Sequence, residues 1–288
     1  MTAHPATGSP APRLVIVIVT YNSRRDIEAC LTALTDMPPS ASHQIVVVDN
    51  ASTDGTPEYV RDAWPHVTVV ESGANLGFAR ANNLAIRRTA SELVLLLNPD
   101  TVVRGDAVDA LVRALDSDPA IAIAGPRIVD GHGRAELSWG AMISPLAELR
   151  QRLLVRGNDR GWQPWVAWVE RRTRLTHAVD WVSGACLLIR RADLEAVGLL
   201  DERYFLYEED VDLCAAVRAR GRGVLFTAAA QIVHLRGRSA ASAPGAARDA
   251  YRRSHLAFYR KHHPGWAPWL VLYLKLRRQL PDTTKQGL

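Results

Sequence analysis

LVLLLNPDT, at residues 93–101, is a short apolar run that ends abruptly in Asn98-Pro99-Asp100. A run of about five apolar residues has the length of a β-strand, whereas a helix that spans a bilayer takes ~20. An apolar side chain at every position indicates that both faces of the strand are covered, as in the centre of a parallel sheet flanked by helices. This stretch therefore predicts an α/β fold and supplies one of its central strands.

The polar end of this strand is a candidate ligand site, because open α/β sheets bind ligands at the carboxyl ends of their strands. Pro99 restricts the backbone and so helps to hold Asp100 in one place. A carboxylate fixed there suits a hard divalent cation that bridges to phosphate oxygens. The alternative is that the sequence NPDT only caps the helix that follows.

Residues 13–125 repeat a pattern of strand followed by helix four times, with connections long enough for parallel crossovers. The first, second and fourth strands, and the loop after the third, each end in Asn or Asp. Four polar ends at one edge of a sheet favour a nucleotide-type site over a chance set of helix caps. Strands are predicted at 13–19, 44–48, 67–71 and 93–97, and helices are predicted to begin near Ser23, Pro57, Ala79 and Asp106.

The stretch 126–180 changes character and shows no clean periodicity. One interpretation is a variable surface insertion. The other is a mobile acceptor-binding segment, whose aromatic rings stack on sugar faces or touch lipid. Its tryptophans, which stand among arginines, are Trp139, Trp162, Trp165 and Trp168.

An acidic cluster at residues 208–212 opens a predicted helix, and Glu208, Glu209, Asp210 and Asp212 belong to it. Acids in a first helical turn are favoured by the helix dipole, which is the structural interpretation. Four acids in five residues exceed what capping requires, and their mutual repulsion suggests that one of them abstracts a proton. Upstream, Gly184 interrupts an apolar strand predicted at 179–190, a pattern typical of close approach by a ligand or another backbone.

The bulk composition is that of an ordinary soluble protein of 288 residues, with 48% hydrophobic and 23% charged residues and a net charge of +5. From Tyr251 onward, eight Lys and Arg residues face one acid, Asp282, which indicates an anionic partner such as a lipid surface or a phosphorylated lipid. Nucleic acid is disfavoured because no recognition motif is present. The three cysteines have no metal-ligand spacing and are predicted to be reduced core residues.

Residues 266–280 contain an apolar run flanked by tryptophans and arginines, too short to span a bilayer. The pattern suits a helix that lies in a membrane interface. The alternative is a helix that packs on the core and is followed by a solvated tail.

Seven motifs follow one another in residues 13–240: TYNS (20–23), VVVDNASTDGT (46–56), NLGFARANN (75–83), LLLNPD (95–100), VSGACLLIRR (182–191), DERYFLYEEDVDLC (201–214) and H-x-x-G-x-S (234–239). Together they resemble family 2 glycosyltransferases of the A-type fold, in the branch that includes rhamnosyltransferases acting on cell-wall or O-antigen lipid intermediates. The resemblance implies a nucleotide-diphospho-sugar transferase (GT-A, Rossmann-like) fold with a mostly parallel central sheet flanked by helices.

The resemblance, together with the composition of the two ends of the chain, predicts a domain organisation. Residues 1–12 are expected to be a disordered leader, and residues 13–240 a catalytic domain. The catalytic domain would comprise a nucleotide-binding half, 13–125, and an acceptor half, 126–240. Residues 241–288 would form a basic helical segment that associates with the membrane.

Motif matching assigns most of the implied site to the nucleotide. Asp49 would hydrogen-bond the edge of a pyrimidine base, and Trp181 and Gly184 would shape the floor where donor sugar and acceptor meet. The residues implied to contact the nucleotide are Thr20, Tyr21, Asn22, Asp49, Asn75, Gly77, Phe78, Asn98 and Asp100.

The resemblance implies a metal and a base as well. Asp100 stands at the last position of the family's Asp-X-Asp motif, with Asn98 at the first, and His234 would be the second protein ligand of Mg²⁺ or Mn²⁺. Asp210 would be the general base, with Glu209 beside it. An inverting transfer needs one base for the acceptor hydroxyl, and a cation can serve the leaving group in place of a protein acid.

The resulting prediction is a cytoplasmic, metal-dependent, inverting glycosyltransferase on the inner face of the cell membrane. Its donor would be dTDP-rhamnose or another dTDP- or UDP-sugar, its acceptor a saccharide on a polyprenyl diphosphate, and a homodimer is considered. One alternative is a sugar-1-phosphate nucleotidyltransferase. That class requires a Gly-rich, Arg-containing phosphate loop directly after the first strand, whereas residues 20–24 (TYNSR) contain no glycine. The other is an inactive sugar-nucleotide-binding subunit, against which Asp100, Asp210 and His234 argue together.

Overall fold

The computed structural model describes residues 11–235 and 244–281. The predicted leader therefore lies outside the described residues except for positions 11 and 12, and so do positions 236–239 of the last motif. The strands are β1 (Leu14–Thr20), β2 (His43–Asp49), β3 (Thr68–Glu71), β4 (Leu93–Leu97), β5 (Thr101–Val103), β6 (Ile121–Val129), β7 (Trp139–Gly140), β8 (His177–Val179), β9 (Trp181–Val182), β10 (Cys186–Arg190) and β11 (Gly223–His234).

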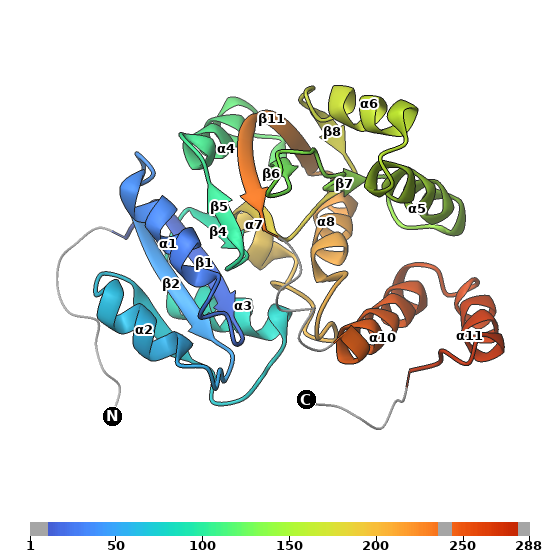
Figure 1. Cartoon of the computed structure of the whole chain (residues 1–288), viewed down its shortest axis with the longest axis horizontal. Helices are drawn as coiled ribbons and strands as arrows, with labels where there is room; N and C mark the ends of the chain where they lie inside the picture. Colours follow the sequence, from blue (N-terminus) through green and yellow to red (C-terminus); the bar gives the residue numbers. More distant parts are fainter. Residues whose placement is uncertain (1–10, 236–243, 282–288) are drawn as a thin grey trace.

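The helices lie around these strands and also extend beyond them at one end of the molecule (Figure 1). In chain order they are α1 (Ile27–Asp36), α2 (Thr56–Ala63), α3 (Phe78–Arg88), α4 (Ala107–Ser117), α5 (Pro145–Asp159), α6 (Gln163–Arg172), α7 (Arg191–Ala196), α8 (Glu209–Ala219), α10 (Pro244–His262) and α11 (Ala267–Leu276).

One nine-stranded sheet forms the centre of the protein, in the order β3-β2-β1-β4-β10-β6-β11-β5, with β8 paired to β11 beside this path. Strands β3, β2, β1 and β4 are parallel neighbours. Strand β10 is antiparallel to both β4 and β6, so β6 and its parallel neighbour β11 run in the same direction as β1. Strands β5 and β8 are antiparallel to β11. The prediction of a mostly parallel sheet flanked by helices is confirmed.

Strand β4 is buried on both faces, as its composition predicts. Leu93, Leu95 and Leu97 pack in a cluster with residues of α1, α2 and α4. Val94 and Leu96 point the other way, into a cluster with residues of α3, α7 and α8. Alternation of side chains along a strand thus gives each face its own helical layer.

Two local predictions were wrong, and a third stretch was left without predicted elements. The first helix begins at Ile27, because the Ser23 carbonyl accepts the backbone N–H groups of Asp26 and Ile27 and closes a turn first. The strand predicted at 179–190 is divided into β8, β9 and β10. The stretch 126–180 holds the two helices α5 and α6, with a groove of about 560 Å³ between them.

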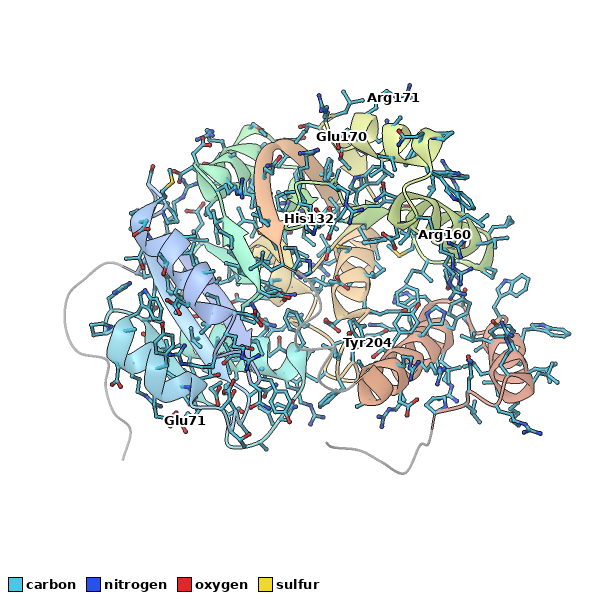
Figure 2. All side chains as sticks on the ribbon, in the orientation of Figure 1. Glu71, His132, Arg160, Glu170, Arg171 and Tyr204 are labelled. Atoms are coloured by element: carbon cyan, nitrogen blue, oxygen red, sulfur yellow. The ribbon has the colours of Figure 1, made fainter. Side chains whose placement is uncertain are left out.

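The C-terminal helix α10 packs on α8 instead of standing apart. Tyr204, Val211 and Phe258 share a small apolar cluster there. Tyr204 is labelled beside α10 in Figure 2. The buried carboxylate of Asp212 accepts from the Tyr204 hydroxyl (3.1 Å) and lies 2.7 Å from Lys261 Nζ. Burial of a charge is stable only with such partners, so this contact fixes α10 to α8.

Two further findings concern the core and the surface. Cys30, Cys186 and Cys214 are free and buried, which confirms the prediction for all three cysteines. Among the residues that the structure describes, no helix has the length and apolar character needed to cross a membrane.

Candidate functional site

The carboxyl ends of β1 and β2 are joined by buried side chains. Thr20 and Asp49 are register partners in the parallel ladder, and the Thr20 hydroxyl donates to Asp49 Oδ1 (3.1 Å). The other carboxylate oxygen accepts from the backbone N–H of Ser52 (2.9 Å). Two donors hold the Asp49 carboxylate in one orientation at the edge of the sheet.

The loop after β3 is tied to the same edge through Asn50. Its amide nitrogen donates to Asn75 Oδ1 (3.0 Å) and to the carbonyl of Gly77 (3.2 Å), and its oxygen accepts from the N–H of Leu76 (2.8 Å). One buried amide therefore sets the path of the predicted nucleotide loop, since it satisfies donors and acceptors on both sides.

Gly77 and Phe78 face the segment that precedes α8. The Phe78 N–H donates to the carbonyl of Phe205 (2.7 Å). Gly77 has φ +79°, and a Cβ atom there would lie 2.3 Å from that same carbonyl oxygen. Only glycine fits this close approach, so the loop that holds Gly77 packs tightly against the segment that leads to the acidic cluster.

Tyr21 and Asn22 lie beyond the end of β1. Asn22 has φ +51°, and its side-chain oxygen accepts from the N–H of Thr53 (2.8 Å). The Tyr21 ring is 45% exposed. Asn22 therefore braces the neighbouring loop, while Tyr21 offers an open aromatic face on which a base could stack.

Asp100 and His234 lie side by side at the end of β4. Strand β5 pairs with β11, so that Thr101 is the register partner of His234, and the Asp100 carbonyl accepts from the N–H of Leu235 (2.9 Å). Asp100 Oδ1 is 3.2 Å from His234 Nε2, and Glu136 Oε2 is 3.7 Å from Nδ1. Burial alone lowers the pKa of His234, but the adjacent carboxylates of Asp100 and Glu136 outweigh burial and raise it to about 9.

The spacing of Asp100 and His234 fits a divalent cation. Adjacent ligand atoms of an octahedral ion with bonds of ~2.1 Å lie ~3 Å apart, and Asp100 Oδ1 and His234 Nε2 are 3.2 Å apart. A cation in place of the bridging proton would leave Nδ1 facing Glu136, the arrangement that orients metal-bound histidines. The described residues contain no group of three or more His, Cys, Asp or Glu able to hold a metal, so two protein ligands are what this part of the chain offers here.

Asn98 connects this strand end to the loop before β10. Its N–H donates to the carbonyl of Ala185 (2.9 Å), and its carbonyl accepts from the Thr101 hydroxyl (2.6 Å). Since Ala185 follows Gly184, the two predicted halves of the site adjoin at this point.

Asp210 is held by two backbone donors. Its Oδ2 accepts from Gly184 N–H (2.7 Å) and its Oδ1 from Val211 N–H (2.8 Å). Burial raises the pKa of Asp210, and the Gly184 and Val211 hydrogen bonds oppose that rise. A carboxylate that is oriented and more basic than usual is suited to accept a proton.

Gly184 borders this carboxylate, and Trp181 packs in a cluster with the next residue of α8, Val211. The indole nitrogen of Trp181 donates to the carbonyl of Ala141 (2.9 Å). A Cβ atom on Gly184 would lie 3.1 Å from Asp210 Cβ. The missing side chain therefore gives Asp210 room for its present position.

Glu209 and Glu208 differ from Asp210 in being buried away from the surface. Burial raises the pKa of Glu209 well above its usual range, with the Asp210 charge adding to the effect, and Glu209 Oε2 has no hydrogen-bond partner among the described residues. Burial also raises the pKa of Glu208, although His255 opposes it. Burial and the Asp210 charge disfavour the ionised form of Glu209, whereas two backbone N–H groups favour that of Asp210, which makes Asp210 the better base of the pair.

His255 joins α10 to both α5 and the acidic segment. Its Nδ1 lies 2.6 Å from Glu208 Oε1, and its Nε2 lies 3.1 Å from Glu148 Oε1. The second contact lacks the alignment of a hydrogen bond and acts as an ion pair. Burial lowers the pKa of His255, but the two glutamates more than compensate and raise it to about 9, so the imidazole is charged.

Sequence reasoning missed Glu136, Glu148 and His255. Glu136 and Glu148 lie in the stretch that showed no periodicity, and His255 lies in a segment considered only for its charge. Their contacts pair residues more than 90 positions apart, which no local pattern reveals. Histidines among the arginines of this basic segment are a signal that the sequence does offer.

Comparison with known proteins places the chain in a family. The model of the family Glycosyl transferase family 2 matches residues 15–198. The chain is 32% identical to N-acetylglucosaminyl-diphospho-decaprenol L-rhamnosyltransferase of Mycobacterium tuberculosis, over 88% of this chain and 86% of that protein. It is 23% identical to rhamnosyltransferase WbbL of Escherichia coli K12, over 76% of this chain and 82% of that protein.

Solved structures agree on the fold. Mannosyltransferase PcManGT of Pyrobaculum calidifontis, in complex with GDP-Man and Mn²⁺, superposes with a TM-score of 0.59 at 21% identity, over 91% of this chain and 69% of that one. TarS 1–349 of S. aureus, in complex with UDP-GlcNAc, gives 0.57 at 16% identity, over 86% and 66% of the two chains. The predicted GT-A fold is confirmed.

Proposed function

Because the chain belongs to glycosyl transferase family 2, with a rhamnosyltransferase among its relatives, we propose that it is an inverting sugar transferase. It transfers a sugar, with L-rhamnose from dTDP-rhamnose preferred, to a saccharide carried on a polyprenyl diphosphate. The product would serve the synthesis of cell wall or surface polysaccharide. The name of the Mycobacterium tuberculosis relative supports both the sugar and the carrier class.

The observation that carries the reaction class is the setting of Asp210. Gly184 and Val211 hold its carboxylate with backbone N–H groups, and the loop of Gly184 adjoins Asn98. Asp210 would take the proton of an acceptor hydroxyl as that oxygen forms its bond to the anomeric carbon and the nucleoside diphosphate leaves. One displacement on the opposite face inverts the anomeric centre, and a single base is enough for it.

The donor would lie along the edge formed by β1, β2 and β4. Asp49 would accept from a pyrimidine base, while Asn75 and Gly77 would line the ribose and diphosphate. Asp100 and His234 would hold Mg²⁺ or Mn²⁺, which supplies charge neutralisation for the departing diphosphate when it is bound. The Mn²⁺ in the PcManGT structure supports a divalent cation in this fold.

Association with the inner membrane surface is part of the proposal. Trp269 and Leu276 on α11 are 65% and 77% exposed, and Leu146 on α5 is 75% exposed. Large apolar side chains on neighbouring helices, next to arginines, suit a surface that contacts lipid headgroups. A lipid-linked acceptor would be met there.

The test is sugar transfer measured by mass spectrometry. The wild-type chain would be incubated with dTDP-rhamnose, UDP-GlcNAc, UDP-glucose or GDP-mannose and a polyprenyl-diphosphate GlcNAc acceptor, with Mg²⁺, Mn²⁺ or EDTA. We expect transfer from dTDP-rhamnose, lost with EDTA. Asp210→Asn should lose it as well, whereas Asp62→Asn, the same exchange on the exposed side of α2, should keep it.

Other outcomes separate the rivals. Transfer from a UDP-sugar alone would keep the enzyme and change its donor. Binding of dTDP-rhamnose in calorimetry without transfer from any donor would favour an inactive binding subunit. Full activity of Asp210→Asn would remove Asp210 as the base and leave Glu209 to be tested.

A further inference from the structure

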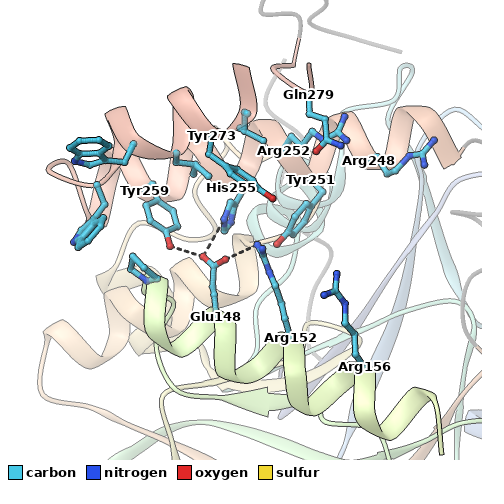
Figure 3. Close-up of a pocket in the computed structure, with 15 residues that line it drawn as sticks. Glu148, Arg152, Arg156, Arg248, Tyr251, Arg252, His255, Tyr259, Tyr273 and Gln279 are labelled. Atoms are coloured by element: carbon cyan, nitrogen blue, oxygen red, sulfur yellow. Dashed lines mark hydrogen bonds and ion pairs between the residues drawn. The ribbon is translucent and has the colours of Figure 1, made fainter. Parts of the chain in front are cut away.

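A cavity of about 590 Å³ lies between α5, α10 and α11, and of the candidate-site side chains described above only Glu148 and His255 line it. Figure 3 shows Arg152 and Arg156 pointing from α5 toward α10, which contributes Arg248 and Arg252 to the opposite wall. We call it the arginine cavity. Its volume is within the range of ~300–1,000 Å³ typical of small-molecule sites.

The charge of the arginine cavity is not balanced by its own lining. Four arginines line it, and Glu148 is the one lining carboxylate. Glu148 is already engaged, since it accepts from Tyr259 (2.7 Å) and lies 2.7 Å from Arg152. Like charges gathered in one cavity repel unless an anion joins them, and guanidinium groups match phosphate oxygens in geometry as well as charge.

Two of the arginines are available for such an anion. The side chains of Arg156 and Arg248 make no hydrogen bond or ion pair with any other residue that the structure describes, and both residues are exposed at the cavity. Arg252 has a partner, Asp249, at 3.2 Å on its own helix. The free pair, from α5 and α10, therefore forms the candidate phosphate contact.

The other end of the arginine cavity is aromatic and apolar. Trp266, Trp269, Leu270 and Leu274 line it from α11 and the residue before it. The two indoles are 53% and 65% exposed, which is unusual for side chains with so large an apolar surface. A ligand with a phosphate head and a hydrocarbon chain would satisfy both ends.

The wall of the arginine cavity is also in contact with the segment of the proposed base. Glu148 lies 3.1 Å from His255, and His255 lies 2.6 Å from Glu208, two residues before Asp210. All three side chains are buried or nearly so. A phosphate head group bound at this wall would therefore lie close to residues 208–210, which include the proposed base Asp210.

We propose that the arginine cavity binds the diphosphate and the first part of the hydrocarbon chain of an isoprenoid-type lipid. The proposal rests on the proposed function, because it makes this lipid the carrier of the acceptor saccharide. The density of positive charge favours a diphosphate over a single phosphodiester. Arg156 and Arg248 contact the phosphates, and Trp266 and Trp269 contact the chain.

The experiment measures binding of the full chain to vesicles, without any sugar donor. Phosphatidylcholine vesicles would carry either a small share of polyprenyl diphosphate or phosphatidylglycerol at matched surface charge. We expect wild type to bind the diphosphate vesicles at least tenfold more tightly, with inorganic pyrophosphate competing. Arg156→Gln combined with Arg248→Gln should weaken that binding roughly thirtyfold, from two phosphate contacts of about 1 kcal/mol each.

The matched control is Arg88→Gln combined with Arg220→Gln, which removes the same charge from exposed positions at the C-terminal ends of α3 and α8; its binding should equal that of wild type. Equal binding to both vesicle types would overturn the diphosphate assignment in favour of general attraction to anionic lipid. An unchanged affinity in the cavity variant would overturn the site itself. The vesicle experiment measures no sugar transfer, so its failure leaves the proposed enzyme activity standing. Selective binding to the diphosphate vesicles, together with no transfer in the mass-spectrometric assay, would refute only that activity.

Discussion

The two ends of this molecule are built on different principles. At the edge formed by β1, β2 and β4, polar side chains such as Asp49 and Asn50 are buried and satisfied by loops that follow directly from the strands. The helices α5, α6, α10 and α11, grouped away from β1–β3 in Figure 1, leave large apolar residues and arginines exposed.

This difference between the two ends matches the two different ligands of the proposed function, a nucleotide-sugar donor and a lipid-linked acceptor. A small polar donor calls for a rigid, pre-arranged edge, since binding then costs little ordering. A large amphiphilic acceptor at a membrane calls for exposed apolar and basic surface, whose stability comes from a few long-range contacts such as Glu148 with His255. The following predictions test this contrast.

The largest expected effect is on chemistry, where the two ends meet. Asp210→Asn should lower kcat by about 10²–10⁴-fold, the usual contribution of a general base. Nucleotide binding at the strand edge should stay within twofold, as measured by calorimetry. A parallel loss of nucleotide affinity would mean that the two ends are not separable.

The next effect is on stability at the strand edge. Gly77→Ala places a Cβ atom against the Phe205 carbonyl at φ +79° and should lower the free energy of unfolding by ~3 kcal/mol or more. Gly73→Ala has a similar φ, +76°, but no atom within 4 Å, and should cost only ~1 kcal/mol. Urea denaturation of both variants measures the difference. Equal losses would show that the approach of the two loops is not tight.

A smaller effect concerns pH and the helical end. The pKa of His255 is raised to about 9, so its stabilisation is complete below ~6.5, the unfolded value, and is lost as pH rises through 9. Unfolding free energy should therefore fall between pH 7 and 9.5, with roughly 2 kcal/mol due to His255. His234 contributes with the same sign in metal-free protein.

Stability measured against pH in His255→Asn should show a shallower slope than wild type. The exposed His132→Asn provides the control and should retain the wild-type slope. A slope unchanged in His255→Asn would refute the charged state of this histidine.

The smallest effect on the fold should come from the exposed face of α11. Leu276→Ser should change stability by less than about 0.5 kcal/mol but weaken binding to anionic vesicles roughly fivefold. Leu175→Ser, an exposed leucine that lies on neither α5 nor α11, should leave vesicle binding unchanged. Equal behaviour of both variants would contradict the membrane-facing role of α11.

The strand edge could be predicted from the sequence because its signals are local. Runs such as 93–97 are apolar at every position, and each ends in a polar residue at a known edge of the sheet. Asp100 and His234 were paired by motif, and the structure brings them to 3.2 Å. The predicted start of α1 at Ser23 was wrong because a backbone turn at Ser23 precedes the helix.

The helical end could not be predicted, for a physical reason. Leu146, Leu149 and Leu153 of α5 are 75%, 59% and 50% exposed, so the apolar positions of that helix do not report a core-facing stripe. Contacts such as Glu148 with His255 join segments that are far apart in the chain. Only the folded chain shows that α10 brings a charged histidine between two glutamates.

The burial of the cysteines has a practical consequence for chemical labelling. Burial raises the pKa of the thiols of Cys30 and Cys214 to about 12 and that of Cys186 further still, so their thiolate forms are scarce at neutral pH. Maleimide reagents should therefore react very slowly with the native thiols of the folded protein. A single cysteine introduced at an exposed site of α11 could then carry a fluorophore or spin label, and would report how deeply this helix enters a bilayer without any prior removal of the natural cysteines.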